Sequence, residues 1–131
     1  MRDQILQSVA DMLGALLSAP VVIGPISPLG GYAVDFEGGA PIEIFRPLTS
    51  TEEQPIVFNG KAENQQNLAV SMNTAHVALT TSSALPFAET WQIYAIETTA
   101  APRLIAREQN KNYIYGSSFR IKFFAKGGQN G

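Results

Sequence analysis

The chain has no cysteine and a single histidine, His76, among its 131 residues. The absence of thiols excludes a disulfide framework, thiolate catalysis and thiolate metal sites. A Ser–His–acid triad would have to use His76, which has no acidic residue three or four positions away. Serines occur without the glycine-flanked pattern of a nucleophile elbow. We therefore expect no enzyme, no cofactor and no metal site.

Charge is also scarce, at 15% of the residues, against roughly 25% in a typical globular domain. Hydrophobic residues make up 45% of the chain, which is enough to build a core without disulfides. No apolar run approaches the roughly 20 residues needed to cross a bilayer. Asp3 and Asp11 interrupt the apolar N-terminal stretch, unlike a signal peptide. The sequence predicts a soluble cytoplasmic protein without a membrane partner: one domain at residues 1–125, then a flexible polar tail at 126–131.

The few charges are distributed unevenly along the chain. Residues 1–102 contain three basic and ten acidic side chains, a net charge of −7. Residues 103–131 contain six basic side chains and one acid, a net charge of +5. Such asymmetry suits head-to-tail self-association, in which the acidic face of one copy meets the basic face of the next. An ordinary solvated hairpin face that is basic explains it equally well.

An amphipathic helix is predicted at residues 3–18. Asp3 serves as its N-cap, and Pro20 ends it because the residue before proline avoids the helical region. The apolar stripe of this helix consists of Ile5, Leu6, Val9, Met12, Leu13, Leu16 and Leu17. One face of the helix must therefore lie on an apolar surface, which we expect to be a sheet.

A second helix is predicted at residues 63–80, beginning at Glu63 or Asn64. Its stripe consists of Leu68, Met72, Ala75 and Leu79, widened by Val70, Val77 and Ala78. His76 lies beside this stripe, where a lone histidine is usually a surface or core-edge residue.

Segments rich in β-branched and aromatic residues predict strands. They lie at 21–23, 32–36, 42–46, 55–58, 90–98, 102–107 and 113–124. A glycine-rich turn at 37–41 would join two of them into a hairpin, residues 48–54 would form a loop, and small residues would turn the chain after Thr98. The element order predicts an α+β fold: an antiparallel or mixed sheet of about five to six strands with two helices packed on one face.

Two ligand-binding interpretations have plainer explanations. The glycine pairs at 30–31 and 38–39 precede strands, so no helix N-terminus is available there for a phosphate. The last third combines aromatic and basic side chains, as platforms for single-stranded nucleic acid do. However, the alternation at 119–123 sends phenylalanines to one face and cations to the other. We expect no sequence-specific nucleic-acid partner. Gly116, in the middle of a strand, indicates a bulge or a close neighbour.

The second half of the chain resembles a known kind of protein. The strand-then-helix step at 55–68 and the strands at 91–98, 102–107 and 113–124 look like the ending of small minor capsid and tail-terminator proteins of long-tailed phages and prophages. The resemblance implies a structural virion protein. Such proteins form rings, commonly hexameric, that cap the tail tube and join it to the head-completion proteins. Localisation would be cytoplasmic during assembly and then in the virion.

For a ring subunit, loops and charged side chains are the expected contacts with a neighbouring copy or with the lumen. The loops are 37–41 and 48–54. The side chains are Glu37, Glu52, Glu53, Arg103, Arg107, Arg120 and Lys122. Plain solvent exposure of all these residues remains an open explanation. The alternative function is a small monomeric module that binds a peptide or apolar ligand between its helices and its sheet.

Overall fold

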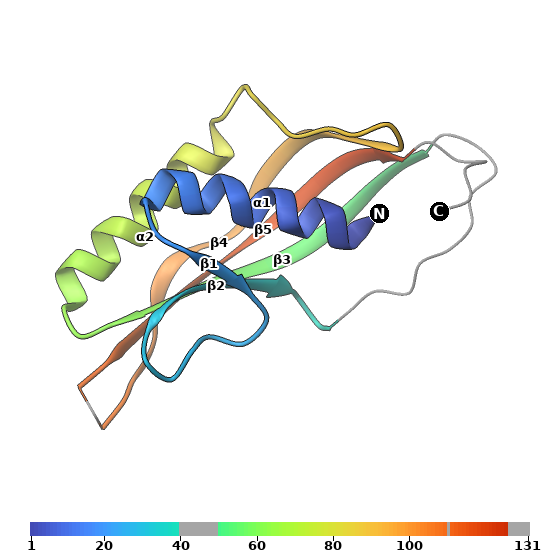
Figure 1. The fold of residues 1–131 in the computed structure, drawn as a ribbon. Helices are drawn as coiled ribbons and strands as arrows, with labels where there is room; N and C mark the ends of the chain where they lie inside the picture. Colours follow the sequence, from blue (N-terminus) through green and yellow to red (C-terminus); the bar gives the residue numbers. More distant parts are fainter. Residues whose placement is uncertain (40–49, 110, 126–131) are drawn as a thin grey trace.

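The computed structural model describes residues 1–39, 50–109 and 111–125. These form two helices and five strands (Figure 1). Their bounds are α1 Arg2–Leu17, β1 Val21–Ile23, β2 Gly31–Phe36, β3 Ser50–Ala62, α2 Gln65–Thr80, β4 Trp91–Arg107 and β5 Tyr113–Ala125. The predicted α+β class is confirmed.

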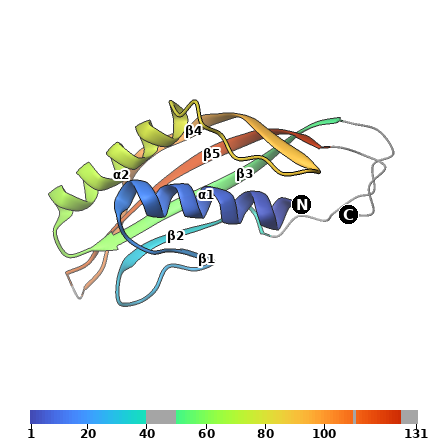
Figure 2. The ribbon, with the colours of Figure 1, turned by 45° about the horizontal axis from the view of Figure 1, so that its top comes forward.

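The five strands make one mixed sheet in the order β1-β2-β3-β5-β4. β1 and β2 are parallel, and every other neighbouring pair is antiparallel. Both helices lie on the same side of the sheet, as Figures 1 and 2 show from two directions. α1 packs over β1 and β2, whereas α2 packs mainly over β4 and β5. We call the side of the sheet that meets the helices the covered face, and the other side the open face.

The core fills the layer between the helices and the covered face. Along β5, Phe119, Ile121 and Phe123 are fully buried there, while Arg120 and Lys122 between them are not. This confirms the predicted alternation, which follows from the period of two in a strand. The largest fully buried partners from other elements are Ile5, Leu6, Leu13, Ile56, Phe58, Leu68, Met72, Leu79 and Ile93.

The predicted helix stripes are correct at their centres and too wide at their margins. Leu16, Val70 and Val77 are about half exposed, so their assignment to the stripes is wrong. Val70 and Val77 each lie two residues from a buried stripe residue, which is roughly 200° around a helix. They therefore face away from the sheet. Asn64 caps α2 as predicted, with its side chain accepting a hydrogen bond from the Asn67 N–H at 2.9 Å.

The start of α1 also differs from the prediction. The helix begins at Arg2 with Met1 in the N-cap position, and no side chain caps it. Asp3 lies inside the first turn, where a carboxylate still complements the positive end of the helix dipole.

The two strands predicted at 90–98 and 102–107, with a turn between them, are wrong. The chain continues as one strand, β4, whose 17 residues face the 13 residues of β5. The register shifts between Ile93 and Ala95, Thr98 and Ala100, Ala100 and Arg103, and Leu104 and Ala106. Bulges take up extra residues without ending a strand, so the small residues at 99–101 remain in the sheet.

The loop predicted at 48–54 is wrong from residue 50 onward. Ser50–Gln54 are the first five residues of β3 and pair with Ile121–Ala125 of β5. A long-range partner thus overrides their polar composition. The strand predicted at 42–46 lies outside the described residues, as do the end of the turn at 40–41 and the tail at 126–131.

Candidate interaction surface

Four charged side chains from three adjacent strands meet on the open face of the sheet. Arg120 Nε of β5 lies 3.6 Å from Glu53 Oε2 of β3, and Lys122 Nζ lies 3.2 Å from Glu97 Oε1 of β4. Each cation also lies near the other carboxylate, at 3.9 and 4.0 Å. Two cations and two carboxylates therefore balance one another within one chain. We call this group the charged ladder.

A second polar cluster joins the start of α1 to the start of β3. Arg2 Nη2 lies 3.1 Å from Glu52 Oε1, and Arg2 Nη1 donates to Gln54 Oε1 at 2.7 Å. The same guanidinium lies over the Phe123 ring, 5.2 Å from its centroid. These contacts hold Glu52 against its own chain.

The ends of β4 and β5 extend as a hairpin arm past the beginning of α2 (Figure 1). Arg107 lies over the ring of Tyr113, 5.5 Å from its centroid. Near the tip of this arm, Glu108 directly follows β4, and its Oε1 lies 2.9 Å from Nζ of the buried Lys61 of β3. The arm is basic in sequence, and this ion pair attaches it to β3.

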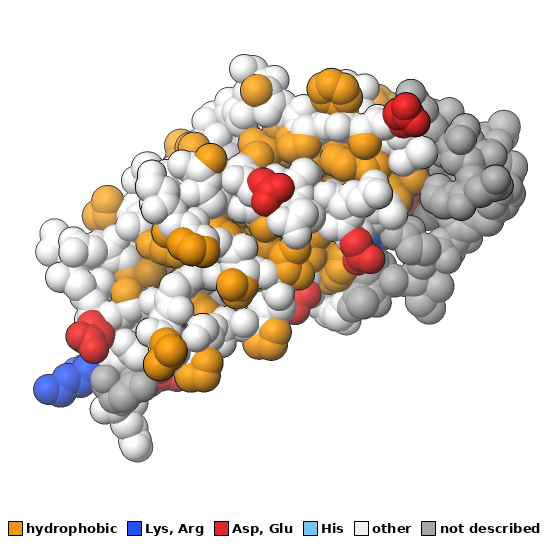
Figure 3. Space-filling model, in the orientation of Figure 1, with side chains coloured by type: hydrophobic (Ala, Val, Ile, Leu, Met, Phe, Trp, Pro, Cys, Tyr) orange, Lys and Arg blue, Asp and Glu red, His pale blue; other side chains and the backbone are white. Residues whose placement is uncertain are grey.

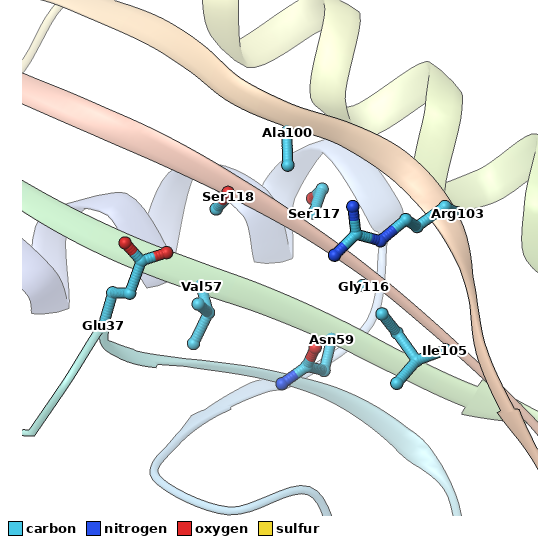
Figure 4. A pocket seen from close by; sticks show the side chains of 9 residues that line it. All are labelled: Glu37, Val57, Asn59, Ala100, Arg103, Ile105, Gly116, Ser117 and Ser118. Atoms are coloured by element: carbon cyan, nitrogen blue, oxygen red, sulfur yellow. The ribbon is translucent and has the colours of Figure 1, made fainter.

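A shallow hollow of about 130 Å³ opens on the open face beside the arm (Figure 4). It is lined by Glu37, Val57, Asn59, Ala100, Arg103, Ile105, Gly116, Ser117 and Ser118. A Cβ at Gly116 would lie 2.7 Å from Asn59 Oδ1 and 2.9 Å from Ile105 Cγ1, which confirms the close neighbour predicted there. Pockets for drug-sized ligands measure roughly 300–1,000 Å³. This hollow is smaller, and it is not between the helices and the sheet, where the binding-module alternative requires a site.

The structure shows what surrounds each of the seven side chains for which the sequence predicts a subunit or lumen contact. Three belong to the charged ladder, two line the hollow, and two are paired with Arg2 and Tyr113. Their contact with a neighbouring subunit stays a prediction. Sequence reasoning missed Glu97, which completes the ladder. A signal was present in the sequence, because Glu97 is the one charged residue between Trp91 and Pro102.

His76 is buried between α2 and the sheet. Its Nε2 lies 2.7 Å from Thr98 Oγ1, and its ring stacks on Phe119 with centroids 4.5 Å apart. Burial lowers the pKa of His76 below its ordinary value, because desolvation disfavours the imidazolium. The imidazole is therefore neutral at pH 7. Its neighbours are a hydroxyl and an aromatic ring, which give it a place in the core packing.

Two further properties concern the described part of the chain. Within residues 1–39, 50–109 and 111–125, no three His, Asp or Glu side chains are grouped so that they could hold a metal ion. Neither helix there has the length and apolarity to span a bilayer.

No protein-family model matches the sequence, and no curated protein matches it. The fold, by contrast, resembles nine chains in solved structures. One of them comes from a structure described as the virion of a native gene transfer agent particle. The two chains superpose with a TM-score of 0.61 at 14% sequence identity, over 92% of this chain and 94% of the other. The likeness therefore extends over nearly the whole fold of both chains.

Proposed function

We propose that this chain is a structural virion protein of a phage or prophage-like particle, a tail-terminator or minor-capsid-like subunit of a ring at the head–tail junction. The observation that carries the proposal is the end-to-end fold likeness to a chain of the gene transfer agent virion. The resemblance of residues 55–68 and 91–124 to minor capsid and tail-terminator proteins supports a place at the head–tail junction. The partners are further copies of the chain and other tail or head-completion proteins.

A ring subunit acts through its surfaces. Closing a ring requires two different patches on each subunit, so that each copy binds one neighbour on either side. The structure presents candidate surfaces for such contacts: an open sheet face, a hairpin arm, and two strands at the margins of the sheet. This combination supports an assembly role.

The proposal assigns no catalysis to the chain. The single imidazole is held by Thr98 and stacked on Phe119. Its role is to pack between α2 and the sheet. His76→Gln should therefore leave assembly unchanged, whereas an enzyme that used this imidazole would lose its activity.

Native mass spectrometry and electron microscopy of the purified chain test the proposal. We expect closed oligomers of one size with a central opening, formed more completely as protein concentration rises. A chain that stays monomeric up to about millimolar concentration would contradict it, since weak ring contacts reach that range. In a genome that produces particles, deletion of the gene should leave filled heads and tails that are not joined. The binding-module alternative instead predicts a monomer whose melting temperature rises with an added ligand.

A further inference from the structure

Two long stretches of the chain contain no charge. No Asp, Glu, Lys or Arg occurs between Asp11 and Asp35, nor between Glu63 and Glu89. In the structure, the first stretch contains the end of α1, β1 and the connection to β2, and the second contains α2 and the connection to β4. Of the eleven large hydrophobic side chains that are exposed in the described residues, seven lie in these two stretches. Uncharged chain and exposed apolar side chains thus coincide.

Apart from Leu16 of α1, these side chains fall into two sets, which we name by the elements that hold them. The β1-edge patch consists of Val22 and Ile23 of β1 and Leu29 of the loop after it, and the α2-edge patch consists of Val70 and Val77 of α2 and Phe87 of the connection after it. Leu29 is 96% exposed and Phe87 is 76% exposed, and the other four are about half exposed. Single exposed hydrophobic residues are ordinary, whereas groups of them without charges mark interaction sites.

The two patches lie on opposite sides of the subunit. The described sheet ends at β1 on one side and at β4, beneath α2, on the other. Figure 2 shows β1 and the loop after it along the lower side, and α2 with its connection to β4 along the upper side. Figure 3, in the orientation of Figure 1, shows hydrophobic groups at the upper and lower margins as well as across the face between them. One copy can therefore contact one neighbour through its β1-edge patch and a second neighbour through its α2-edge patch.

We propose that the β1-edge patch of one copy packs on the α2-edge patch of the next. This inference rests on the proposed ring function and names its subunit contact. A contact that repeats around a ring is heterologous, which requires two different patches that are compatible with each other and lie apart on the subunit. Two apolar, uncharged patches meet without desolvating an unpaired charge.

Two observations favour a second copy over an unrelated partner. First, both halves of the contact occur on the same chain, and each is the kind of surface that the other would bury. Second, the charged ladder on the open face is already balanced by Glu53, Glu97, Arg120 and Lys122 within one subunit, so it leaves no unmatched charge for a neighbour. β1 is an edge strand of the described sheet and has no charged side chain. Charged side chains are the usual protection of an edge strand against pairing with another chain.

The test places one carboxylate in each patch, with Leu29→Glu and Phe87→Glu. Both side chains are largely exposed in the subunit, so neither change should alter its melting temperature by more than a degree or two. Each variant alone should lose the ring and weaken self-association at least about tenfold, as measured by native mass spectrometry and sedimentation, because a buried carboxylate is left unpaired. Ile23→Glu and Val77→Glu repeat the test at a second position of each patch.

Mixing the two variants gives the decisive result. The Leu29→Glu copy keeps its α2-edge patch and the Phe87→Glu copy keeps its β1-edge patch, so an equimolar mixture should form a discrete heterodimer that cannot grow. Thr51→Glu is the matched control, because it adds the same charge at an exposed position of β3 outside both patches. It should form rings as the unaltered chain does.

The remaining outcomes overturn the inference. Rings from either single variant, self-paired dimers of one variant, or a mixture that remains monomeric would each show that the two patches do not meet. If the unaltered chain forms rings and the variants do too, the patch assignment is wrong and the proposed function stands. If the unaltered chain is strictly monomeric, both are wrong.

Discussion

The two faces of the sheet differ most clearly along β5, where consecutive residues belong to different environments. Phe119, Ile121 and Phe123 are fully buried under the helices, and Arg120 and Lys122 point to the open face. The covered face gains its stability from apolar area removed from water, at roughly 25 cal/mol per Å². The open face relies on ion pairs in contact with solvent, which contribute about 0–1 kcal/mol each.

The comparison separates folding from assembly. The covered face forms the core, and the four charges of the ladder on the open face pair with one another. The two apolar patches at the margins of the described sheet belong to neither group. Stability should therefore respond to changes on the covered face, and assembly to changes at the margins.

The largest expected effect is at the centre of the covered face. Phe119→Ala should lower the free energy of unfolding by about 3–5 kcal/mol, because it leaves a cavity beside Phe58 and His76. Phe124→Ala is the matched change on the open face, where the ring is partly exposed. Among the described aromatic rings it contacts only Tyr94, with the two ring centroids 4.6 Å apart. Phe124→Ala should lower the free energy of unfolding by about 1 kcal/mol. Urea unfolding at low protein concentration measures both, and equal losses would remove the distinction between the faces.

A pair of glycines sharpens the same comparison. At Gly60, on the covered face, a Cβ would lie 2.8 Å from Met72 Sδ and 2.9 Å from Leu68 Cδ1. Gly60→Ala should therefore lower the free energy of unfolding by about 1–3 kcal/mol through overpacking. At Gly116, on the open face, a Cβ would lie at similar distances from side-chain atoms of Asn59 and Ile105. Ile105 is about half exposed and Asn59 is partly exposed, so both side chains can shift toward solvent. The cost of Gly116→Ala should be below about 1 kcal/mol, and a larger loss at Gly116 than at Gly60 would contradict this account.

His76 makes the stability of the covered face depend on pH. Its pKa is lowered in the folded chain by burial, so the unfolded chain binds the proton more readily. Stability should be unaffected by His76 above about pH 7 and should fall as pH drops below the ordinary imidazole pKa of about 6.5, with a slope of at most about 1.4 kcal/mol per pH unit. Urea unfolding between pH 7.5 and 5.5 measures this slope. His76→Gln, which retains a polar group near Thr98, should flatten it, and an unchanged slope would assign the pH dependence to other groups.

The fold was predictable where a pattern is local. The stripe from Leu68 to Leu79 and the alternation at Phe119–Phe123 identified a helix and a strand with their buried faces, because periods of 3.6 and 2 are direct consequences of backbone geometry. Prediction failed where a partner strand decides the outcome. By composition, the small residues at 99–101 are typical of a turn and Ser50–Gln54 of a loop. In the structure both segments are strand residues because they pair with β5.

The candidate surface was less predictable for the same reason. The sequence indicated the charged residues but not their pairing within one subunit, since Glu53, Glu97 and Lys122 are far apart along the chain and meet only across strands. Val70 and Val77 were assigned to the core because they are apolar and helical. The side of α2 that faces the sheet is set by the larger group of apolar residues from Leu68 to Leu79. Val70 and Val77 lie on the opposite side of the helix and are exposed.

The smallest expected effect is in the charged ladder, and it bears directly on assembly. A double-mutant cycle with Glu97→Gln and Lys122→Met should give a coupling energy of about 0.2–1 kcal/mol at low salt, which declines in 1 M NaCl because the pair is partly exposed. Neither substitution should change ring formation if the apolar patches at the margins join the subunits. Ring formation should then persist or strengthen in 1 M NaCl, as measured by sedimentation. Rings that dissociate with salt, or that are lost in Lys122→Met, would return the subunit contact to the acidic and basic residues of the open face.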